Sequence, residues 1–451
     1  MLRGVSYDAV ILGAGPAGEV ATGILAEAGL RVALVERELV GGECGYWACI
    51  PSKTLLRPPE ARQESQRAPG VSTPELDWHR VAAYRDWMIR DLDDARAVAG
   101  YEDRGVSVFK ASGRIVGPGR VDVGSQVLET HHVIVATGSD PWIPEIPGLA
   151  EAGYWTNREA TTLREIPSSA VFLGGGAVGV ELGQMLARFG SRVTIVQAAD
   201  RLLDREDVEV GRLIADELRS DGVELALGRR ATRVRREGAV RVVELDDGGE
   251  VSGEVLVVSA GRRPRVAGLG LDAVGIVTGE RGIPIDERCR AAENVWAIGD
   301  VTGVALFTHV GKYQARVATA NILGEARVAD YRAVPRVVFS DPEVAAVGLT
   351  AEQAEERGLV VSAVTLDLAS AIARPYTYEE NPRGHLGLVV DRERDTLVGA
   401  WAVAPLAGEW IHQAVLAIRA EIPVTVLLDT IAQFPTFSEA YVSALRSLPA
   451  G

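Results

Sequence analysis

Apolar positions near the start of the chain follow a strand, helix and strand pattern. Residues 7–12 form an apolar run typical of a buried strand, and a glycine-rich stretch, 13–18, follows at once. Residues 19–30 have helical composition, and the apolar run 31–36 predicts a second strand. The same order of strand, glycines, helix and strand recurs at 170–173, 174–179, 180–189 and 192–197. The distance along the chain between the two copies, from residue 13 to residue 174, is too long for a solenoid repeat. It fits two separate domains of one kind.

The rest of the pattern is less regular. We expect a loop or frayed helix at 58–74, a long polar helix at 78–100 and a proline-rich linker at 141–147. Further predictions are a turn between short strands at 113–119, a buried strand at 295–299 and a helix around 410–420. From residue 335 the alternation of strands, turns and helix predicts an α+β domain.

The glycines of both copies are typical of dinucleotide binding. A G-x-G-x-x-G turn lets the backbone approach a pyrophosphate at the N-terminus of a helix. One such turn is a weak signal, but two copies, each framed by a strand and a helix, are a strong one. The six positions expected to bind cofactor are Gly13, Gly15, Gly18, Gly174, Gly176 and Gly179.

The two copies differ at the residue that would contact a ribose. Glu36 stands where an acid binds the 2′-hydroxyl, which favours an unphosphorylated adenosine ribose. Gln197 stands at the equivalent place in the second copy, and its amide would repel a 2′-phosphate much less. Arg201 is near enough in sequence to contact such a phosphate. The second copy therefore leaves the choice between the two coenzymes open.

Composition excludes several classes of function. The chain has 451 residues, 47% of them hydrophobic, and a net charge of -15, which argues against disorder and against nucleic acid as a main partner. We find no apolar run long enough for a membrane helix and no signal-peptide pattern at the N-terminus. Three cysteines in so long a chain do not make a secreted disulfide scaffold. We expect a soluble protein of a reducing compartment, the cytoplasm.

Two of the cysteines, Cys44 and Cys49, lie in the segment 41–53. In a regular helix their axial separation would be about 7.5 Å, beyond the ~7 Å limit on the Cα separation of a disulfide. For a disulfide, Cys44 must therefore lie in a distorted entry turn, which Gly45 would permit. A cysteine at the start of a helix lies near the positive end of the helix dipole, which favours its thiolate. The alternative is that both are buried free cysteines.

This segment resembles the G-G-x-C-x-x-x-x-C-I-P-S-K motif of the flavoprotein disulfide reductases, the family of glutathione reductase, dihydrolipoamide dehydrogenase and mercuric reductase. The resemblance covers essentially the whole chain. Residues 133–139 are similar to the family's A-T-G segment, 295–300 to its second FAD fingerprint and 335–343 to the start of its dimerisation domain.

The resemblance implies an α/β fold class, with two Rossmann-like dinucleotide-binding domains and a C-terminal α+β dimerisation domain. Residues 1–147 and 268–334 would form the two parts of the FAD-binding domain, and 148–267 the NAD(P)-binding domain. Residues 335–451 would form the interface of a homodimer whose active site is shared between subunits. No nucleic acid or membrane partner and no metal site are expected.

The resemblance also implies a chemistry, with FAD on the first copy and NADH or NADPH on the second. Hydride would pass from nicotinamide to flavin, and the flavin would reduce a Cys44–Cys49 disulfide. Cys49 would form the charge-transfer thiolate, and Cys44 would attack the substrate. Lys53 would pair with Glu181 beside the flavin. The other cofactor contacts expected are Gly113, Thr137, Gly138, Gly261, Asp300, Thr308 and His309.

One departure from the family affects the expected reaction. Disulfide-reducing members carry H-P-T-x-x-E near the C-terminus, where the histidine protonates the leaving thiol and the glutamate orients it. Here Glu439 is present, but Phe434 stands at the histidine position. This argues against efficient reduction of lipoamide or glutathione disulfide. Two interpretations of Tyr46 and Trp47 stay open: they contact an acceptor, or they pack against the partner subunit. Cys289, on an expected loop, is interpreted as incidental.

Three functions therefore stay open. The first is an NAD(P)H oxidoreductase with a redox-active disulfide and an unidentified acceptor. The second is an NAD(P)H reductase of quinones, metal ions or reactive oxidants, which needs no histidine acid. The third is a redox-inactive regulatory subunit that keeps flavin for folding, against which the intact Cys44, Cys49 and Lys53 argue.

Overall fold

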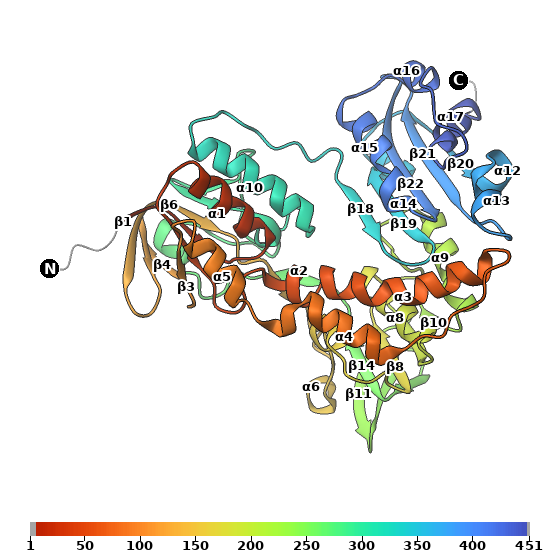
Figure 1. Ribbon diagram of the computed structural model, residues 1–451, viewed down its shortest axis with the longest axis horizontal. Coiled ribbons are helices and arrows are strands. Elements are labelled where there is room, and N and C mark those ends of the chain that lie inside the picture. Colours follow the sequence, from red (N-terminus) through yellow and green to blue (C-terminus); the bar gives the residue numbers. More distant parts are fainter. Residues whose placement is uncertain (1–5, 449–451) are drawn as a thin grey trace. The chain divides into compact units, whose positions relative to one another are not determined.

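The computed structural model describes residues 6–448, and the chain forms two compact units (Figure 1). One unit lies within Met1–Ser52, Ala83–Trp142 and Gly261–Asp330, and the other within Lys53–Ala82, Ile143–Ala260 and Tyr331–Gly451. Each unit is thus assembled from three separate stretches of sequence. Two helices, α3 (Cys49–Arg67) and α4 (Trp78–Met88), carry the chain across the division.

The first unit is built on an eight-stranded sheet whose central strands are parallel. Its main path runs in the order β16-β17-β6-β1-β2-β3, and the hairpin β4–β5 pairs with β6. The strands are β1 (Ser6–Leu12), β2 (Val32–Val35), β3 (Ser107–Phe109), β4 (Arg114–Gly117), β5 (Arg120–Asp122), β6 (Val127–Val135), β16 (Arg290–Ala292) and β17 (Val295–Ala297). A separate pair joins β7 (Ser139–Pro141) to β15 (Arg262–Pro264).

Strand β1 supplies both faces of this sheet. Ala9 and Ile11 enter one apolar cluster, and Val10 and Leu12 enter another, because successive side chains of a strand point to opposite faces. Helices α1 (Pro16–Glu27) and α10 (Thr308–Ile322) lie side by side over this unit (Figure 1). The other helices of this unit are α2 (Gly42–Tyr46) and α5 (Ala95–Glu102).

The second unit begins with the second copy of the strand, glycine and helix pattern. Its parallel sheet has the order β10-β9-β8-β14, beside an antiparallel sheet β11-β12-β13. The strands are β8 (Ser169–Leu173), β9 (Arg192–Gln197), β10 (Glu224–Leu227), β11 (Ala231–Glu237), β12 (Val240–Leu245), β13 (Glu250–Gly253) and β14 (Val255–Val258). The helices of this part are α6 (Leu149–Ala152), α7 (Asn157–Thr161), α8 (Ala177–Arg188) and α9 (Val208–Ser220).

The C-terminal part of the second unit is an antiparallel sheet in the order β18-β19-β22-β21-β20. Its strands are β18 (Pro335–Val338), β19 (Glu343–Gly348), β20 (Val361–Asp367), β21 (His385–Asp391) and β22 (Thr396–Ala404). Its helices are α11 (Ala351–Glu356), α12 (Leu368–Ala371), α13 (Arg374–Tyr378), α14 (Ala407–Trp410), α15 (His412–Arg419), α16 (Val424–Leu428) and α17 (Glu439–Arg446). The α/β fold class predicted from the two glycine motifs, with an α+β domain after them, is confirmed.

The loop or frayed helix predicted at 58–74 is wrong for most of its length. Helix α3 continues to Arg67 with Pro58 and Pro59 inside it. Ion pairs hold this polar helix in place: Arg57 pairs with Glu60 at 3.0 Å and with Glu64 at 2.9 Å. Arg67, at the end of the helix, pairs with the distant residues Asp341 at 2.9 Å and Glu379 at 2.7 Å. These tertiary contacts override the local effect of the prolines.

The long helix predicted at 78–100 is also wrong, because it is two helices. Helix α4 ends at Met88 and α5 begins at Ala95. Between them Arg90, Asp91 and Leu92 all have positive φ, from 49° to 61°. A left-handed turn of three non-glycine residues costs about 1–2 kcal/mol per residue, and the polar pattern of this stretch gives no sign of it.

No helix within residues 6–448 is both long and apolar enough to span a bilayer.

Candidate active site

The glycine-rich turns of the two copies have matching geometry. Gly13 and Gly174 have φ of 102° and 118°, a region that favours glycine. A Cβ atom on Gly18 would lie 1.9 Å from the carbonyl oxygen of Gly13, and one on Gly179 would lie 2.1 Å from that of Gly174. These four glycines are therefore required for the turn itself and for close packing of the helix on its strand.

The middle glycine of each turn has a different environment. A Cβ atom on Gly15 or Gly176 would meet no heavy atom within 4 Å. Packing does not explain a glycine at either position. Each residue lies at the N-cap of its helix, α1 or α8, where backbone N–H groups and the helix dipole favour a phosphate. The geometry of both turns thus fits a bound pyrophosphate.

The two side chains expected to contact ribose accept hydrogen bonds from the glycine turns of their own copies. Glu36 accepts a hydrogen bond from the backbone N–H of Ala14 at 2.7 Å. Gln197 accepts one from the N–H of Gly175 at 2.9 Å through Oε1, which leaves its amino group as a donor. Both side chains therefore lie against the glycine turn of their own copy. Only the first carries a negative charge.

The two cysteines lie on successive helices of the chain. Cys44 lies within α2, and Cys49 is the first residue of α3. The regular helix is interrupted at Trp47, with φ -134° and ψ 0°, and not at Gly45, which stays inside α2. The sequence predicted that Cys44 lies in a distorted turn permitted by Gly45. This position is wrong, because Cys44 lies in regular helix and the distortion comes after it, at Trp47. The break makes Cys49 the cysteine at the N-terminus of the longer helix.

A threonine hydroxyl joins the two sulfur atoms. Thr308 Oγ1 donates a hydrogen bond to Cys44 Sγ at 3.3 Å and lies 3.4 Å from Cys49 Sγ. Both cysteines are free thiols in the structure. A hydrogen bond with Cys49, reinforced by burial, raises the pKa of the Cys44 thiol. The first proton therefore leaves the pair more readily than the second, because the remaining thiol stabilises the thiolate beside it.

Tyr46 and Trp47 pack within the first unit. The Tyr46 ring is buried, its hydroxyl donates to the carbonyl of Val40 at 3.2 Å, and a Cβ atom on Gly41 would lie 2.9 Å from the ring. Trp47 lies against Tyr46 with a ring separation of 5.9 Å. Tyr46 therefore shapes the loop before the cysteines from within its own subunit.

Asp300 lies in a buried polar chain. Ser139 donates to its Oδ2 at 2.6 Å, and Arg262 donates to Ser139 at 2.7 Å. Burial raises the pKa of Asp300, although the Ser139 hydrogen bond and Arg262 act against the rise. The sequence predicted Asp300 as a cofactor contact but missed both partners. Their signal was weak because serine and arginine are common in loops.

The other predicted contacts of the first unit have varied environments. The Thr137 hydroxyl donates to the Arg265 carbonyl at 2.8 Å, and the His309 ring stacks on Phe307 at 5.2 Å. A Cβ atom on Gly113 would lie 2.5 Å from the Leu12 side chain, so packing alone explains this glycine. Two further glycines, Gly138 and Gly261, have positive φ.

Cys289 lies in a turn, as expected, but it is fully buried in the apolar core of the first unit with φ 68°. Its environment is that of a packed core residue. In the second unit, Arg201 donates to the Asp204 carbonyl at 2.8 Å and lies 3.4 Å from Asp200. Arg201 thus already has partners close in sequence.

The predicted pair of Lys53 and Glu181 is present in the second unit. Lys53 Nζ lies 2.8 Å from Glu181 Oε2. Glu181 Oε1 accepts the backbone N–H of Phe339 at 2.9 Å, and the Phe339 ring lies 4.6 Å from Lys53 Nζ. The ring covers the ammonium group in a cation–π contact. No feature of the sequence indicated this role for Phe339, which lies in the segment similar to the start of the dimerisation domain.

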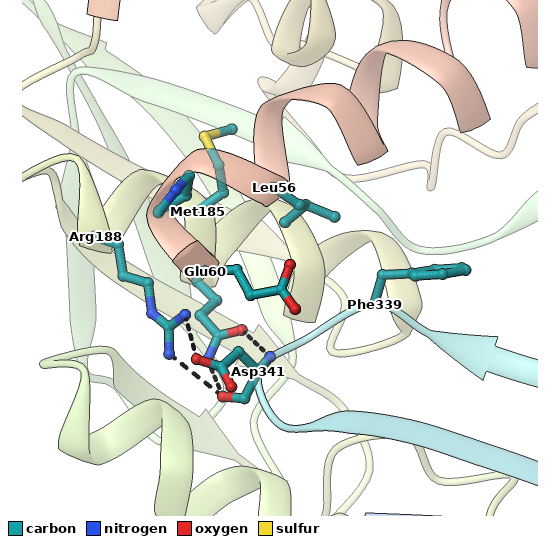
Figure 2. A pocket seen from close by; sticks show the side chains of 8 residues that line it. Leu56, Glu60, Met185, Arg188, Phe339 and Asp341 are labelled. Atoms are coloured by element: carbon teal, nitrogen blue, oxygen red, sulfur yellow. Dashed lines mark hydrogen bonds and ion pairs between the residues drawn. The ribbon is translucent and has the colours of Figure 1, made fainter. Parts of the chain in front are cut away.

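The same face of α8 holds the residues that follow Phe339 (Figure 2). Gln184 accepts the N–H of Asp341 at 2.8 Å and donates to its carbonyl at 2.9 Å. The Asp341 carboxylate pairs with Arg188 at 2.9 Å, Arg67 at 2.9 Å and Arg383 at 3.2 Å. Burial would raise the pKa of Asp341, but the three arginines outweigh it and lower the pKa. This ion cluster joins α3, α8 and the β18–β19 connection.

A small cavity lies beside this cluster, with Glu60 pointing between Leu56 and Phe339 (Figure 2). Its remaining wall is formed by Pro59, Gln184, Met185, Arg188 and Asp341. The empty space there, about 190 Å³, includes space that is open to solvent. Among the described residues we find no cluster of His, Cys, Asp and Glu able to hold a metal ion.

The C-terminal motif is exposed at the histidine position. Phe434 has 76% of its surface exposed, and nearby Ile431 has 96%. The Glu439 carboxylate accepts the backbone N–H of Thr436 at 3.0 Å. Glu439 therefore has a local role in the turn that holds the motif.

Comparisons with known proteins complete this description. Residues 7–322 match the family model described as pyridine nucleotide-disulphide oxidoreductase, and residues 334–445 match the dimerisation domain of that family. The chain is 32% identical to mercuric reductase from Staphylococcus aureus over 447 residues, 97% of this chain and 81% of that protein. It is 34% identical to dihydrolipoyl dehydrogenase from Thermus scotoductus over 455 residues, 98% of this chain and 97% of that protein.

A solved structure is similar over nearly its whole length. It is the Cu(II) complex of the HOCl-induced flavoprotein disulfide reductase RclA from Escherichia coli. The similarity covers 98% of this chain and 99% of that chain, with 31% identity and a TM-score of 0.86.

Proposed function

The chain belongs to the pyridine nucleotide-disulphide oxidoreductases, and from this premise we propose that it passes electrons from NAD(P)H through FAD and a Cys44–Cys49 dithiol to a small-molecule acceptor. The observation that carries this proposal is the single Thr308 hydroxyl at 3.3 Å and 3.4 Å from the two sulfur atoms. Two thiols that share one hydrogen-bonding group at a helix N-terminus are arranged for joint redox chemistry.

FAD and NAD(P)H are the cofactors of this family, and the two glycine turns fit them. When bound, the two cofactors supply the transfer of hydride and of electron pairs that side chains cannot perform. In our proposal the turn at Gly15, with Glu36 and Asp300, holds FAD. The turn at Gly176, with Gln197, holds NAD(P)H.

The cysteines have different roles in this proposal. Cys49, at the first turn of α3, stabilises a thiolate because helix N–H groups face it. Cys44 then carries the remaining proton on its Sγ, shares it with the Cys49 sulfur, and is the thiol that meets the acceptor. Thr308 keeps the two sulfur atoms in reach of each other through its Oγ1.

The residues that hold charge near the reaction are Lys53 and Glu181. Glu181 keeps Lys53 in one orientation through its 2.8 Å ion pair, and it is itself held by the Phe339 amide. In our proposal Asp300 contacts FAD, and its raised pKa reflects the burial of this site.

We further propose the domain boundaries implied by the sequence: FAD-binding at 1–147 and 268–334, NAD(P)-binding at 148–267 and dimerisation at 335–451. The match to the dimerisation domain at 334–445 supports a homodimer with shared active sites. A cytoplasmic location is proposed from the cysteine content.

Phe434 favours a second candidate within the same chemistry. A phenylalanine cannot protonate a leaving thiol, so the acceptor is one that needs no histidine acid, such as a quinone, a metal ion or a reactive oxidant. The similarity to a mercuric reductase, and to an HOCl-induced disulfide reductase solved as its Cu(II) complex, supports this candidate.

Anaerobic titration of the FAD-loaded enzyme with NADH tests the proposal. In denaturant the oxidised enzyme should show one free thiol, Cys289, and the reduced enzyme all three cysteines. Two-electron reduction should also produce a long-wavelength absorption band that depends on Cys49. A Cys49→Ser variant that keeps the band would contradict the assignment of the thiolate, and three free thiols before reduction would contradict the disulfide.

A further inference from the structure

The third lysine of the chain, Lys312, lies on helix α10, whose first residue contacts both cysteines. Thr308, which contacts both sulfur atoms, is the first residue of α10, and Lys312 follows one turn later. Residues four apart lie on the same face of a helix. Lys312 is therefore on the face of α10 that carries the Thr308 hydroxyl.

The direction of helical side chains brings Lys312 closer still. Side chains in a helix tilt toward its N-terminus and cover the preceding turn. This rule directs the exposed Lys312 side chain toward the turn of Thr308, the residue that contacts both sulfur atoms. The positive charge of Lys312 lowers the pKa of Cys44, against the larger effects of Cys49 and burial.

The ammonium group of Lys312 is not committed elsewhere. The other two lysines, Lys53 and Lys110, form ion pairs with Glu181 and Asp94. Within residues 6–448, Lys312 forms neither a hydrogen bond nor an ion pair.

Glu19 on α1 is a carboxyl group whose charge interacts with Lys312. A Cβ atom on Gly311 would lie 3.1 Å from the Ala17 side chain, which shows how closely α10 approaches α1 there. Glu19 also faces Arg90 and Arg104, and the Tyr101 hydroxyl donates to it at 3.4 Å. Burial raises the pKa of Glu19, so it competes less for the lysine.

We infer that Lys312 is the cation that stabilises the Cys44 thiolate, in a chain that has Phe434 where disulfide-reducing members of the family carry a histidine. This inference rests on the proposed function, in which Cys44 meets the acceptor. Lys312 acts through Cys44. Its positive charge favours the thiolate form of Cys44, which makes Cys44 a better nucleophile near neutral pH. The groups that face Cys44 are then Cys49, Thr308 and Lys312, and only the last is a cation.

The pH dependence of thiol alkylation tests the inference. In an FAD-loaded Cys49→Ser background, reduced with a phosphine, iodoacetamide modification of Cys44 is followed by peptide mass spectrometry from pH 6 to pH 10. Lys312→Met should slow the modification at pH 7 by about three- to tenfold, because an opposite charge nearby lowers a thiol pKa. At high pH, where Cys44 is ionised in both proteins, the two rates should converge.

Two control variants complete the experiment. Arg316→Met removes an exposed cation one turn further along α10 and should leave the pH profile unchanged. Lys312→Arg should keep the rate at pH 7. Equal profiles for Lys312→Met and its parent, or an equal slowing in Arg316→Met, would overturn the inference. Because a phosphine reduces the enzyme, the result does not depend on whether NADH reduces the cysteines, which tests the proposed function separately.

Discussion

At the scale of single residues, Phe434 decides which half of the reaction is slow. It stands at the position of a proton donor and has 76% of its surface exposed. General acid catalysis is typically worth 10²–10⁴-fold, or roughly 3–5 kcal/mol. An enzyme without this acid should accept electrons from NAD(P)H rapidly and pass them slowly to lipoamide or glutathione disulfide.

Phe434→His should therefore accelerate the oxidative half-reaction with disulfides by about 10²-fold or more. Stopped-flow measurement of both half-reactions checks this, with the reductive half unchanged. The gain should largely vanish in Phe434→His with Glu439→Gln. Thermal unfolding of Glu439→Gln alone is the control, because Glu439 also holds the Thr436 N–H at 3.0 Å. Flat disulfide turnover in the single variant would mean that Phe434 instead shapes an apolar pocket for an acceptor such as a quinone.

Gln197 determines a second property at this scale, the choice of coenzyme. Its Oε1 accepts the Gly175 N–H. Because the glutamine side chain is uncharged, it does not repel a 2′-phosphate. Arg201, already bound to the Asp204 carbonyl, provides no dedicated site for that phosphate. We expect kcat/KM for NADH and NADPH to differ by less than ~100-fold, about 2.7 kcal/mol.

Gln197→Glu should shift this ratio toward NADH, because a carboxylate repels the 2′-phosphate. Steady-state kinetics with both coenzymes measures the shift, and Glu36→Gln in the other glycine copy is the matched control. A wild-type ratio above the stated limit, or an unchanged ratio in Gln197→Glu, would contradict this account.

At the scale of elements, Asp341 ties helix α3 to helix α8. Its carboxylate pairs with Arg67, Arg188 and Arg383, and all of these groups are largely buried. Removing one partner of a buried ion pair costs about 3–5 kcal/mol, because it leaves the other charges uncompensated. Asp341→Asn should therefore lower the free energy of unfolding by that amount at pH 7 in urea titrations.

The contribution of Asp341 to the free energy of unfolding should decrease as pH falls. Because the three arginines lower the pKa of Asp341, its contribution is present above its ordinary pKa of about 4 and is lost as pH falls through the lowered value. The difference between wild type and Asp341→Asn should narrow below about pH 4. Asp216→Asn on α9, an exposed partner of Arg212, should change stability by under ~1 kcal/mol. A comparable loss in both variants would contradict a special role for Asp341.

At the scale of the whole molecule, the C-terminal domain leaves apolar side chains in water. Ile431 is 96% exposed and Phe434 is 76% exposed, in a region that matches the dimerisation domain of the family. Large exposed apolar side chains in such a region indicate a surface that a second copy covers. We expect twice the 48.0 kDa chain mass in sedimentation experiments.

Ile431→Asp should shift the enzyme toward monomer and reduce its activity in parallel, because burying an unpaired carboxylate at an interface is costly. Val277→Asp, in the first unit and 83% exposed, is the matched control and should stay dimeric. Sedimentation velocity at several protein concentrations distinguishes the two. A dimer that is unaffected by Ile431→Asp would exclude this surface as the contact.

Much of this protein follows from local sequence. The glycine turns and the strands that flank them depend on short stretches of chain, where steric limits on the backbone leave few alternatives. The cysteine segment likewise predicted a helix that starts near the two cysteines. These features could be predicted because each is determined by residues that are close in sequence.

Only the tertiary structure decided the rest. Helix α3 continues through Pro58 and Pro59 because distant partners, Asp341 among them, hold its polar side chains. Thr308 reaches Cys44 and Cys49 from a helix more than half the chain away. Phe339 likewise covers Lys53 from a segment far away in the sequence. Contacts between segments far apart in sequence leave no periodic signal in either one, because their energy depends on how the chain folds back on itself.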